Sequence, residues 1–131
     1  MLKLTKTVEY GLIAITHISQ QKEGQLSSAK YISEKYFIPT ELLAKILQKL
    51  TSLKMLESIK GPKGGYKISA DIKNINIFNL IEMLEGPIGI VECTTSSNCQ
   101  QLETCVIKNP LSKINDKIIN TLKNITLDQI R

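Results

Sequence analysis

The sequence predicts a mainly α-helical fold: a winged helix-turn-helix domain with a two-stranded wing, then a cysteine loop and a long C-terminal helix. Two observations lead to this fold class. Apolar residues recur every three or four positions in several segments separated by turn residues, which is typical of amphipathic helices. A glycine-rich segment, GPKGG at 61–65, separates two short runs with the character of strands. With 131 residues the chain can bury one compact core.

The first two helices are predicted from apolar stripes and capping residues. A helix expected over about 7–20 places four apolar residues on one face: Val8, Leu12, Ile15 and Ile18. Ser27 and Ser28 precede a second helix, and either hydroxyl can cap its N-terminus. We expect the buried face of this second helix to include three side chains: Ile32, Tyr36 and Phe37.

A third helix is predicted to follow Pro39, with Thr40 as its cap and Glu41 in its first turn, where an acid favours the helix dipole. Its buried stripe is apolar: Leu43, Ile46, Leu47, Leu50 and Leu53. Its opposite face is polar and basic: Glu41, Ala44, Lys45, Gln48, Lys49 and Ser52. Two helices joined by a short turn, the second with such a face, are what a helix-turn-helix needs to enter the major groove of DNA.

Two short strands, about 55–60 and 66–69, are predicted on either side of the glycine-rich segment. Three glycines permit a tight turn and close backbone approach: Gly61, Gly64 and Gly65. Lysines surround them, so amides and cations can meet a phosphate backbone or minor groove together: Lys60, Lys63 and Lys67. An ordinary hairpin would explain the glycines alone, and a solvated helix face would explain Lys45 and Lys49. Their order within one short stretch favours a DNA-binding winged helix.

The C-terminal part is predicted to contain a short helix over 77–84, ended by Gly86 and Pro87, and a long helix over about 109–124. Asn109 and Pro110 resemble the cap and first position of the long helix. Its apolar residues are spaced by three and four: Leu111, Ile114, Ile118, Ile119, Leu122 and Ile125. Such a helix must cover the core or pair with a second chain. We favour a homodimer, because two recognition helices can then bind two half-sites. The expected division is a DNA-binding domain at 1–85, a cysteine loop at 86–108 and a dimerisation helix with its tail at 109–131.

The chain has three cysteines, Cys93, Cys99 and Cys105, all within one loop. An odd number of thiols cannot form a complete disulfide framework, and such clustering indicates metal binding. The spacing Cys-x5-Cys-x5-Cys is wider than a Cys-x2-Cys zinc knuckle and suits a larger iron–sulfur cluster. Three unpaired structural cysteines are the alternative. Structural cysteines usually lie in apolar segments, whereas the residues around these three are mostly polar.

The overall composition narrows the class of protein further. The net charge of +5 and pI near 9.1 permit binding to nucleic acid or an anionic membrane. The longest apolar run near the N-terminus, 12–15, cannot span a bilayer, so a cytoplasmic protein without membrane contact is expected. The one histidine, His17, has no evident nucleophile, carboxylate pair or phosphate loop near it in sequence, which argues against an enzyme.

Five motifs, LTKTVEYGL, ELLAKILQKL, KGPKGGYKIS, EGPIGIVEC and NITLDQI, resemble those of the winged-helix iron–sulfur transcription regulators of the IscR and NsrR type. EGPIGIVEC is most similar to the subgroup that regulates SUF iron–sulfur assembly. The resemblance implies a regulator, expected to be a repressor, whose 2Fe–2S or 4Fe–4S cluster sets its affinity for a double-stranded DNA operator. The operators of such regulators control cluster assembly, nitric oxide response or iron homeostasis.

The resemblance also implies roles for particular residues. Cys93, Cys99 and Cys105 correspond to the three cysteine ligands. The implied DNA contacts are Ser28, Pro39, Thr40, Glu41, Ala44, Lys45, Gln48, Lys49, Lys60, Gly61, Lys63, Gly64, Gly65 and Tyr66. Ala44 and Lys45 stand where IscR-like members have glutamate and glutamine, so the operator preference of those members does not transfer.

A fourth cluster ligand is not evident. Lys108 stands where IscR-like members place a histidine ligand. Glu9 matches the aspartate with which NsrR-like members reach the cluster of the partner subunit. Glu92, Glu103, water and a small thiol are alternatives, and Glu9 is otherwise an exposed helical acid. A cluster-free thiol redox sensor or zinc sensor built on the same DNA-binding dimer is the alternative function.

Overall fold

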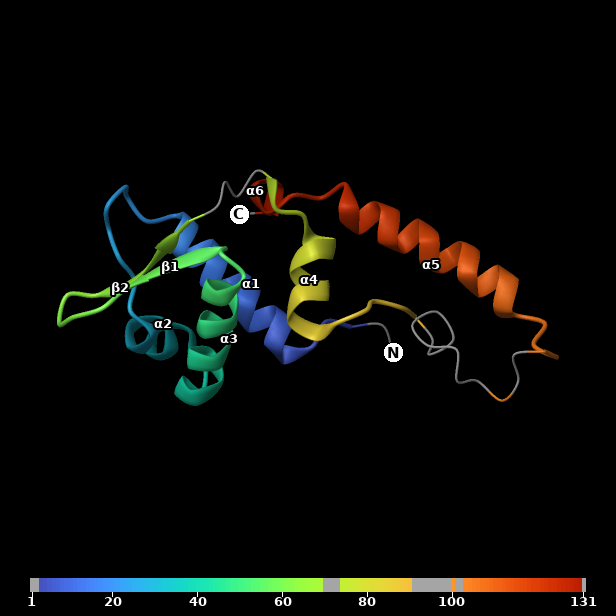
Figure 1. Ribbon diagram of the computed structural model, residues 1–131, viewed down its shortest axis with the longest axis horizontal. Helices are drawn as coiled ribbons and strands as arrows, with labels where there is room; N and C mark the ends of the chain where they lie inside the picture. Colours follow the sequence, from blue (N-terminus) through green and yellow to red (C-terminus); the bar gives the residue numbers. More distant parts are fainter. Residues whose placement is uncertain (1–2, 70–73, 91–99, 101–102, 131) are drawn as a thin grey trace.

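The structure of the protein is a computed structural model that describes residues 3–69, 74–90, 100 and 103–130. Helices and strands follow in the order α1 (Lys6–Ser19), α2 (Ala29–Tyr36), α3 (Thr40–Ser52), β1 (Leu56–Ile59), β2 (Gly65–Ile68), α4 (Ile77–Glu85), α5 (Lys108–Lys123) and α6 (Leu127–Ile130). The two strands form one antiparallel sheet beside the helices (Figure 1). This arrangement confirms the predicted mainly α fold with a two-stranded wing.

The N-terminal helices begin where polar side chains satisfy free backbone amides. Thr5 caps α1 by accepting a hydrogen bond from the Val8 amide, and Ser28 caps α2 by accepting one from the Tyr31 amide. One core unites the apolar faces of these helices with those of α3, α4 and α6: Val8, Ala14, Ile15, Ile18, Ile32, Leu43, Ile46, Leu47, Leu50, Ile77, Leu80, Ile81, Leu84 and Leu127. Gly11 lets the Leu84 side chain of α4 pack close to α1, because a Cβ there would lie 2.8 Å from Leu84 Cδ1.

The turn between α2 and α3 differs from the sequence prediction at Phe37. We expected Phe37 in the core, but its side chain is 91% exposed and its backbone is left-handed, with φ of 55°. The chain reverses at this residue, so Ile38 enters the core instead. Ser33 holds the turn: its carbonyl accepts from the Ile38 amide at 3.0 Å, and its hydroxyl donates to the Ile38 carbonyl at 2.6 Å.

The third helix begins at Thr40, but Thr40 is not its cap. The N-cap is Pro39, which provides no side-chain hydrogen bond, and the Thr40 hydroxyl lies 2.9 Å from that of Ser33. The predicted stripe is buried except for Leu53, which is the C-terminal cap and is partly exposed. The apolar face of α3 therefore ends one turn earlier than its periodicity indicates.

The wing depends on two glycines that no other residue could replace without backbone movement. A Cβ on Gly64 would lie 2.0 Å from the Ile59 carbonyl oxygen, and one on Gly65 would lie 2.7 Å from that of Ser27. Ser27 and Tyr66 exchange backbone hydrogen bonds of 2.7 and 3.1 Å, so the chain just before α2 extends the sheet beside β2. The hairpin projects beyond the helices at one end of the molecule (Figure 1).

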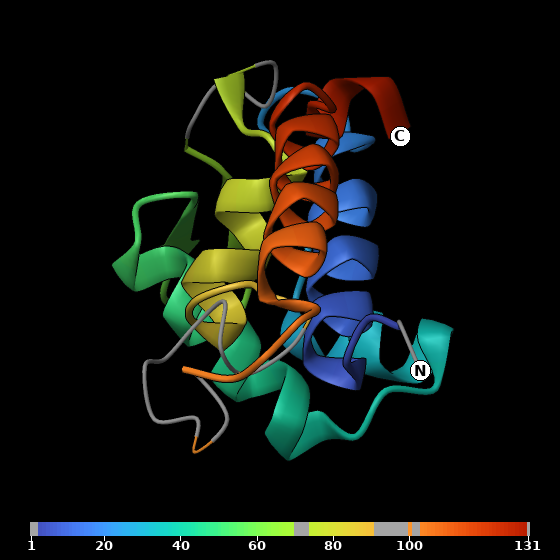
Figure 2. The ribbon, with the colours of Figure 1, turned by 90° about the vertical axis from the view of Figure 1, so that its right-hand side faces the viewer.

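The C-terminal helix is joined to the domain mainly through α4 and the residues that follow α5. The Ile77 amide donates to the Ile125 carbonyl, and the Leu127 amide donates to the Ile75 carbonyl. Asn109 and Pro110 do not cap α5 as predicted, because the helix already begins at Lys108 and has no side-chain cap. Figure 2 shows α5 in front of α4, and in Figure 1 its N-terminal end extends away from the body of the domain.

None of the helices in the described segments is both long enough and apolar enough to cross a membrane.

Replacing Phe37 with glycine tests the left-handed turn. The substitution relieves about 1–2 kcal/mol of backbone strain but adds about 0.5–1 kcal/mol of chain entropy to the unfolded state. We therefore expect the free energy of unfolding, measured in urea, to stay unchanged or to rise by up to about 1 kcal/mol. The neighbouring Ile38→Ala change should lower it by about 2–5 kcal/mol, because Ile38 is buried. A loss of about 3 kcal/mol or more in Phe37→Gly would place the ring in the core.

Candidate nucleic-acid interface and cysteine segment

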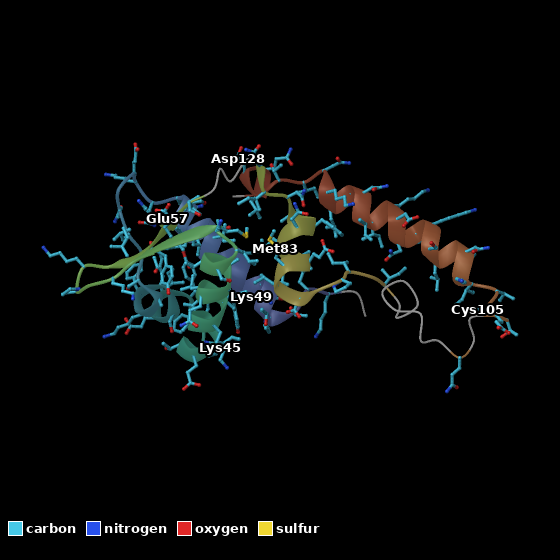
Figure 3. All side chains as sticks on the ribbon, in the orientation of Figure 1. Lys45, Lys49, Glu57, Met83, Cys105 and Asp128 are labelled. Atoms are coloured by element: carbon cyan, nitrogen blue, oxygen red, sulfur yellow. The ribbon has the colours of Figure 1, made fainter. Side chains whose placement is uncertain are left out.

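The polar face predicted for α3 is exposed. Thr40, Glu41, Lys45, Gln48 and Lys49 lie on the surface, Ala44 is half-buried among them, and Pro39 is exposed at the start of the helix. Figure 3 shows Lys45 and Lys49 on this helix. Since the opposite stripe is buried against α1, α2 and β1, the helix presents this face and no other to a ligand.

Lys49 has a second role that its sequence position did not indicate. Its ammonium donates a hydrogen bond of 3.1 Å to the Leu84 carbonyl in the last turn of α4. A cation at the C-terminus of a helix is favourable, because the free carbonyl groups there are partly negative. Lys49 therefore connects the predicted recognition helix to the helix that leads toward the cysteines. The two partners are 35 residues apart, and local periodicity contains no signal of such a pair.

The wing places its predicted contact residues around the hairpin turn. Lys60, Gly61 and Lys63 are exposed, while Gly64, Gly65 and Tyr66 are half-buried. Through the backbone pairing of Ser27 with Tyr66, the wing is also connected to the start of α2, where Ser28 uses its hydroxyl as the helix cap. The backbone pairing thus connects two predicted contact regions, the wing and the start of α2. The third predicted region, α3, is connected to the wing through its packing against β1.

Lys67 differs from the other wing lysines because it forms an ion pair with the neighbouring strand. Lys67 Nζ lies 3.3 Å from a Glu57 carboxylate oxygen on the paired strand, and both side chains are partly exposed. Such a pair contributes little to stability, but it neutralises charge at the base of the wing. The free cationic character of the wing is therefore concentrated toward its turn.

His17, the one histidine of the chain, is buried. Its side chain is 4% exposed, its Nδ1 lies 2.9 Å from the Tyr36 hydroxyl, and its Nε2 lies 3.3 Å from Gln21. Burial, with a smaller contribution from the nearby Lys35 cation, lowers the pKa of His17 below its ordinary value. A cavity of about 400 Å³ lies beside it, bounded by α1, α2 and the segment 25–27. These contacts account for His17 as a hydrogen-bonded core residue.

The cysteine segment is described only in part. Cys93 and Cys99 lie outside the described residues, as does Glu92. Cys105 is a free, half-buried thiol just before α5, at the opposite end of the molecule from the wing (Figures 1 and 3). The described residues contain no group of three or more histidine, cysteine or acidic side chains that could hold a metal ion.

The two predicted acidic candidates that the structure describes are both accessible. Glu9 lies in the first turn of α1, and its carboxylate accepts a hydrogen bond of 2.9 Å from Lys6 Nζ, which raises the pKa of Lys6. An exposed pair of this kind contributes little to stability, so a stronger ligand can replace the lysine. Glu103 is exposed two residues before Cys105.

A helix-turn-helix with an exposed polar recognition face and a glycine-supported hairpin wing defines a winged-helix DNA-binding protein. The chain belongs to the Rrf2 family, whose model, described as an iron-dependent transcriptional regulator, matches residues 4–131.

Related proteins agree with this assignment. The chain is 31% identical over 114 residues to the HTH-type transcriptional regulator NsrR of Bacillus subtilis, covering 86% of this chain and 78% of that protein. It is 28% identical over 131 residues to NsrR of Oceanobacillus iheyensis, covering 98% of this chain and 89% of that protein. These relatives are transcriptional regulators, and so is this chain, which is not an enzyme.

Solved structures confirm the fold. The global cysteine regulator CymR of B. subtilis superposes with a TM-score of 0.78 at 24% identity, covering 99% of this chain and 96% of the other. IscR of T. potens superposes with a TM-score of 0.76 at 23% identity, covering 98% and 85%.

Proposed function

We propose that the chain is a homodimeric repressor that binds a DNA operator and changes its affinity according to an iron–sulfur cluster held by Cys93, Cys99 and Cys105. One observation supports this best: a winged-helix surface and a thiol-bearing segment lie at opposite ends of one chain of the Rrf2 family. Its place of action would be the cytoplasm, where both DNA and reduced thiols are available.

The DNA contacts divide by chemistry. Lys45, Lys60 and Lys63 are exposed cations suited to phosphate oxygens, and the backbone amides around Gly61 can approach the same groups closely. Side chains of α3, all exposed except for the half-buried Ala44, would meet base edges in the major groove: Thr40, Glu41, Ala44, Lys45 and Gln48. Ser28 and Pro39 would fix the angle at which the helix pair approaches DNA. Lys49 would contribute less to DNA than Lys45, because its ammonium already bonds to α4.

The cluster would be held by three thiolates and one further ligand. When bound, it would supply a centre whose oxidation or loss alters the segment around it. Cys105 is free and partly accessible, which suits a ligand. Lys108 begins α5, and its side chain is a poor fourth donor because an ammonium group has no lone pair to offer iron. We assign that position to Glu9 of the partner subunit, whose carboxylate is a harder and weaker donor to iron than thiolate.

The dimer would form through the N-terminal half of α5. Apolar residues in and before this half are exposed or only half-buried: Val106, Ile107, Leu111 and Ile114. Asn115 is the one buried residue that the structure describes in α5. A second copy of the chain would cover this apolar face and bring Glu9 of one subunit toward the cysteines of the other.

We further propose iron–sulfur assembly genes as the targets, on the strength of the EGPIGIVEC motif. A second function, a cluster-free thiol or zinc sensor on the same DNA-binding dimer, is favoured by one observation. The Cys105 thiol is free and partly accessible, and an accessible thiol can be oxidised or can bind zinc without a cluster.

The wing is tested by the double change Lys60→Ala and Lys63→Ala. For every lysine–phosphate ion pair that the change removes, the slope of log affinity against log salt should fall by about 0.9, and binding to all sequences should weaken together. Fluorescence anisotropy over a salt series measures both quantities. The control, Lys113→Ala with Lys117→Ala on α5, removes the same charge away from the wing and is compared once sedimentation has shown that it is still a dimer. An unchanged slope in the wing variant would exclude the wing from the interface.

The cofactor is tested by the visible spectrum of protein purified without oxygen. Wild-type protein should be brown, and each Cys→Ser change should abolish or sharply weaken that absorption. Glu9→Ala should keep the colour but shift the spectrum and shorten cluster lifetime with a chelator, while Glu103→Ala should not. Colourless wild-type protein containing zinc, or no metal, would instead support the thiol or zinc sensor.

The dimer is tested by Ile114→Asp. The Ile114 side chain is 48% exposed in one chain, so a charge there should leave the domain folded but oppose burial against a partner. Sedimentation should show a monomer with an unchanged circular dichroism spectrum. Ser112→Asp, on a different face of the same exposed half, is the control and should stay dimeric. A dimeric Ile114→Asp protein would exclude this face from the interface.

A further inference from the structure

The segment that connects α4 to the cysteines is attached to three helices. At its start, Leu84 accepts the hydrogen bond from Lys49 of α3, and the Glu85 carboxylate accepts one from the Thr5 hydroxyl at the start of α1. At its far end, the Ile90 amide donates a hydrogen bond of 3.1 Å to Asn115 Oδ1 of α5. Residues 84–90 therefore touch the predicted recognition helix, the first helix and the C-terminal helix within one short stretch.

Asn115 is an unusual residue for its position. It is 6% exposed and lies in the wall of a cavity of about 280 Å³ whose other walls are largely apolar, including Ile81, Ile118 and Leu122. A buried amide in such surroundings is costly unless it is hydrogen-bonded, whereas leucine of similar size would pack favourably. Packing alone does not account for an asparagine at this position, whereas the hydrogen bond from the Ile90 amide does.

The bond between Ile90 and Asn115 closes the base of the cysteine segment. Ile90 precedes Cys93 by three residues, and Asn115 follows Cys105 by ten. Any rearrangement that draws the cysteines together or releases them must act on the chain at these two ends. Because the Ile90 amide is hydrogen-bonded to Asn115, a displacement of α5 is transmitted to residues 84–90. The contacts of Leu84 and Glu85 extend that displacement to α3 and α1.

We propose that Asn115 is a positioning residue that couples the state of the cysteine segment to the DNA-binding helices. This inference rests on the proposed function and adds to it the route of regulation. Asn115 lies outside the proposed DNA-contacting surface and is not one of the proposed cluster ligands. Its effect is on the difference in operator affinity between the metal-loaded and metal-free forms, not on binding itself.

Two substitutions separate the hydrogen bond from packing. Asn115→Leu keeps the volume and removes the acceptor, whereas Asn115→Asp keeps an acceptor for the Ile90 amide. Ile90→Pro removes the donor from the other side of the bond. Asn120→Leu is the matched control, because Asn120 lies on the exposed surface of the same helix.

The measurement is the ratio of operator dissociation constants for protein reconstituted with iron and sulfide and for the same protein stripped by chelator. Coupling between sites in proteins is typically about 5- to 150-fold. We expect this ratio to fall to about 1 in Asn115→Leu and Ile90→Pro, and to keep its wild-type value in Asn115→Asp and Asn120→Leu. The visible spectrum of the reconstituted protein should be the same in all four variants, since none is a ligand. Hydrogen exchange at the Ile90 amide should be faster in Asn115→Leu.

The outcomes are distinct. A wild-type ratio of about 1 would remove the proposed sensing function and this inference with it. A wild-type ratio well above 1 that persists in Asn115→Leu, despite faster exchange at Ile90, would overturn this inference alone. If Asn115→Leu does not fold, the other two variants test the inference. An unchanged ratio in Ile90→Pro would overturn the inference. So would a ratio of about 1 in Asn115→Asp while the Ile90 amide remains protected from exchange.

Discussion

The buried face of α3 determines how the rest of the domain is arranged. Leu43, Leu47 and Leu50 are fully buried, and their helix contacts α1, α2 and β1. Burial of three such side chains stabilises the fold by about 1.5–3 kcal/mol each. Because a helix has only one such stripe, this burial fixes the rotation of α3 about its axis. The polar face then has one possible direction, outward, so core packing and the orientation of the recognition surface are a single constraint.

Backbone geometry imposes a second constraint, at the two turns beside α3. The chain enters α3 through a left-handed residue held by Ser33 and leaves it toward a hairpin that tolerates no side chain at Gly64. Both turns lie next to residues proposed to contact DNA. Rigid turns lower the entropy lost on binding, because the contact groups are already ordered before DNA arrives.

Local sequence patterns predicted much of this arrangement, and the features that they did not predict have physical reasons. Helix periodicity, the Ser28 cap and the glycine-rich turn are local signals, and the structure agrees with each. Phe37 and Thr40 were misassigned because a helix end depends on which way the chain turns, and Ser33 decides that here. The bonds from Lys49 to Leu84 and from Ile90 to Asn115 join residues 35 and 25 positions apart. No periodicity contains such pairs, and only folding brings their partners together.

The two halves of α5 are stabilised in different ways. Its C-terminal half is anchored through α4 and the backbone pairing of 75–77 with 125–127, while its N-terminal half begins without a cap and buries no residue before Asn115. A helix of 16 residues gains most of its stability from packing, so the exposed half is stable chiefly when something covers it. Cys105 lies at the start of that half. In the proposed dimer, partner binding would therefore stabilise the half of the helix that lies next to Cys105, and Asn115 stands at the boundary between the anchored half and the exposed half.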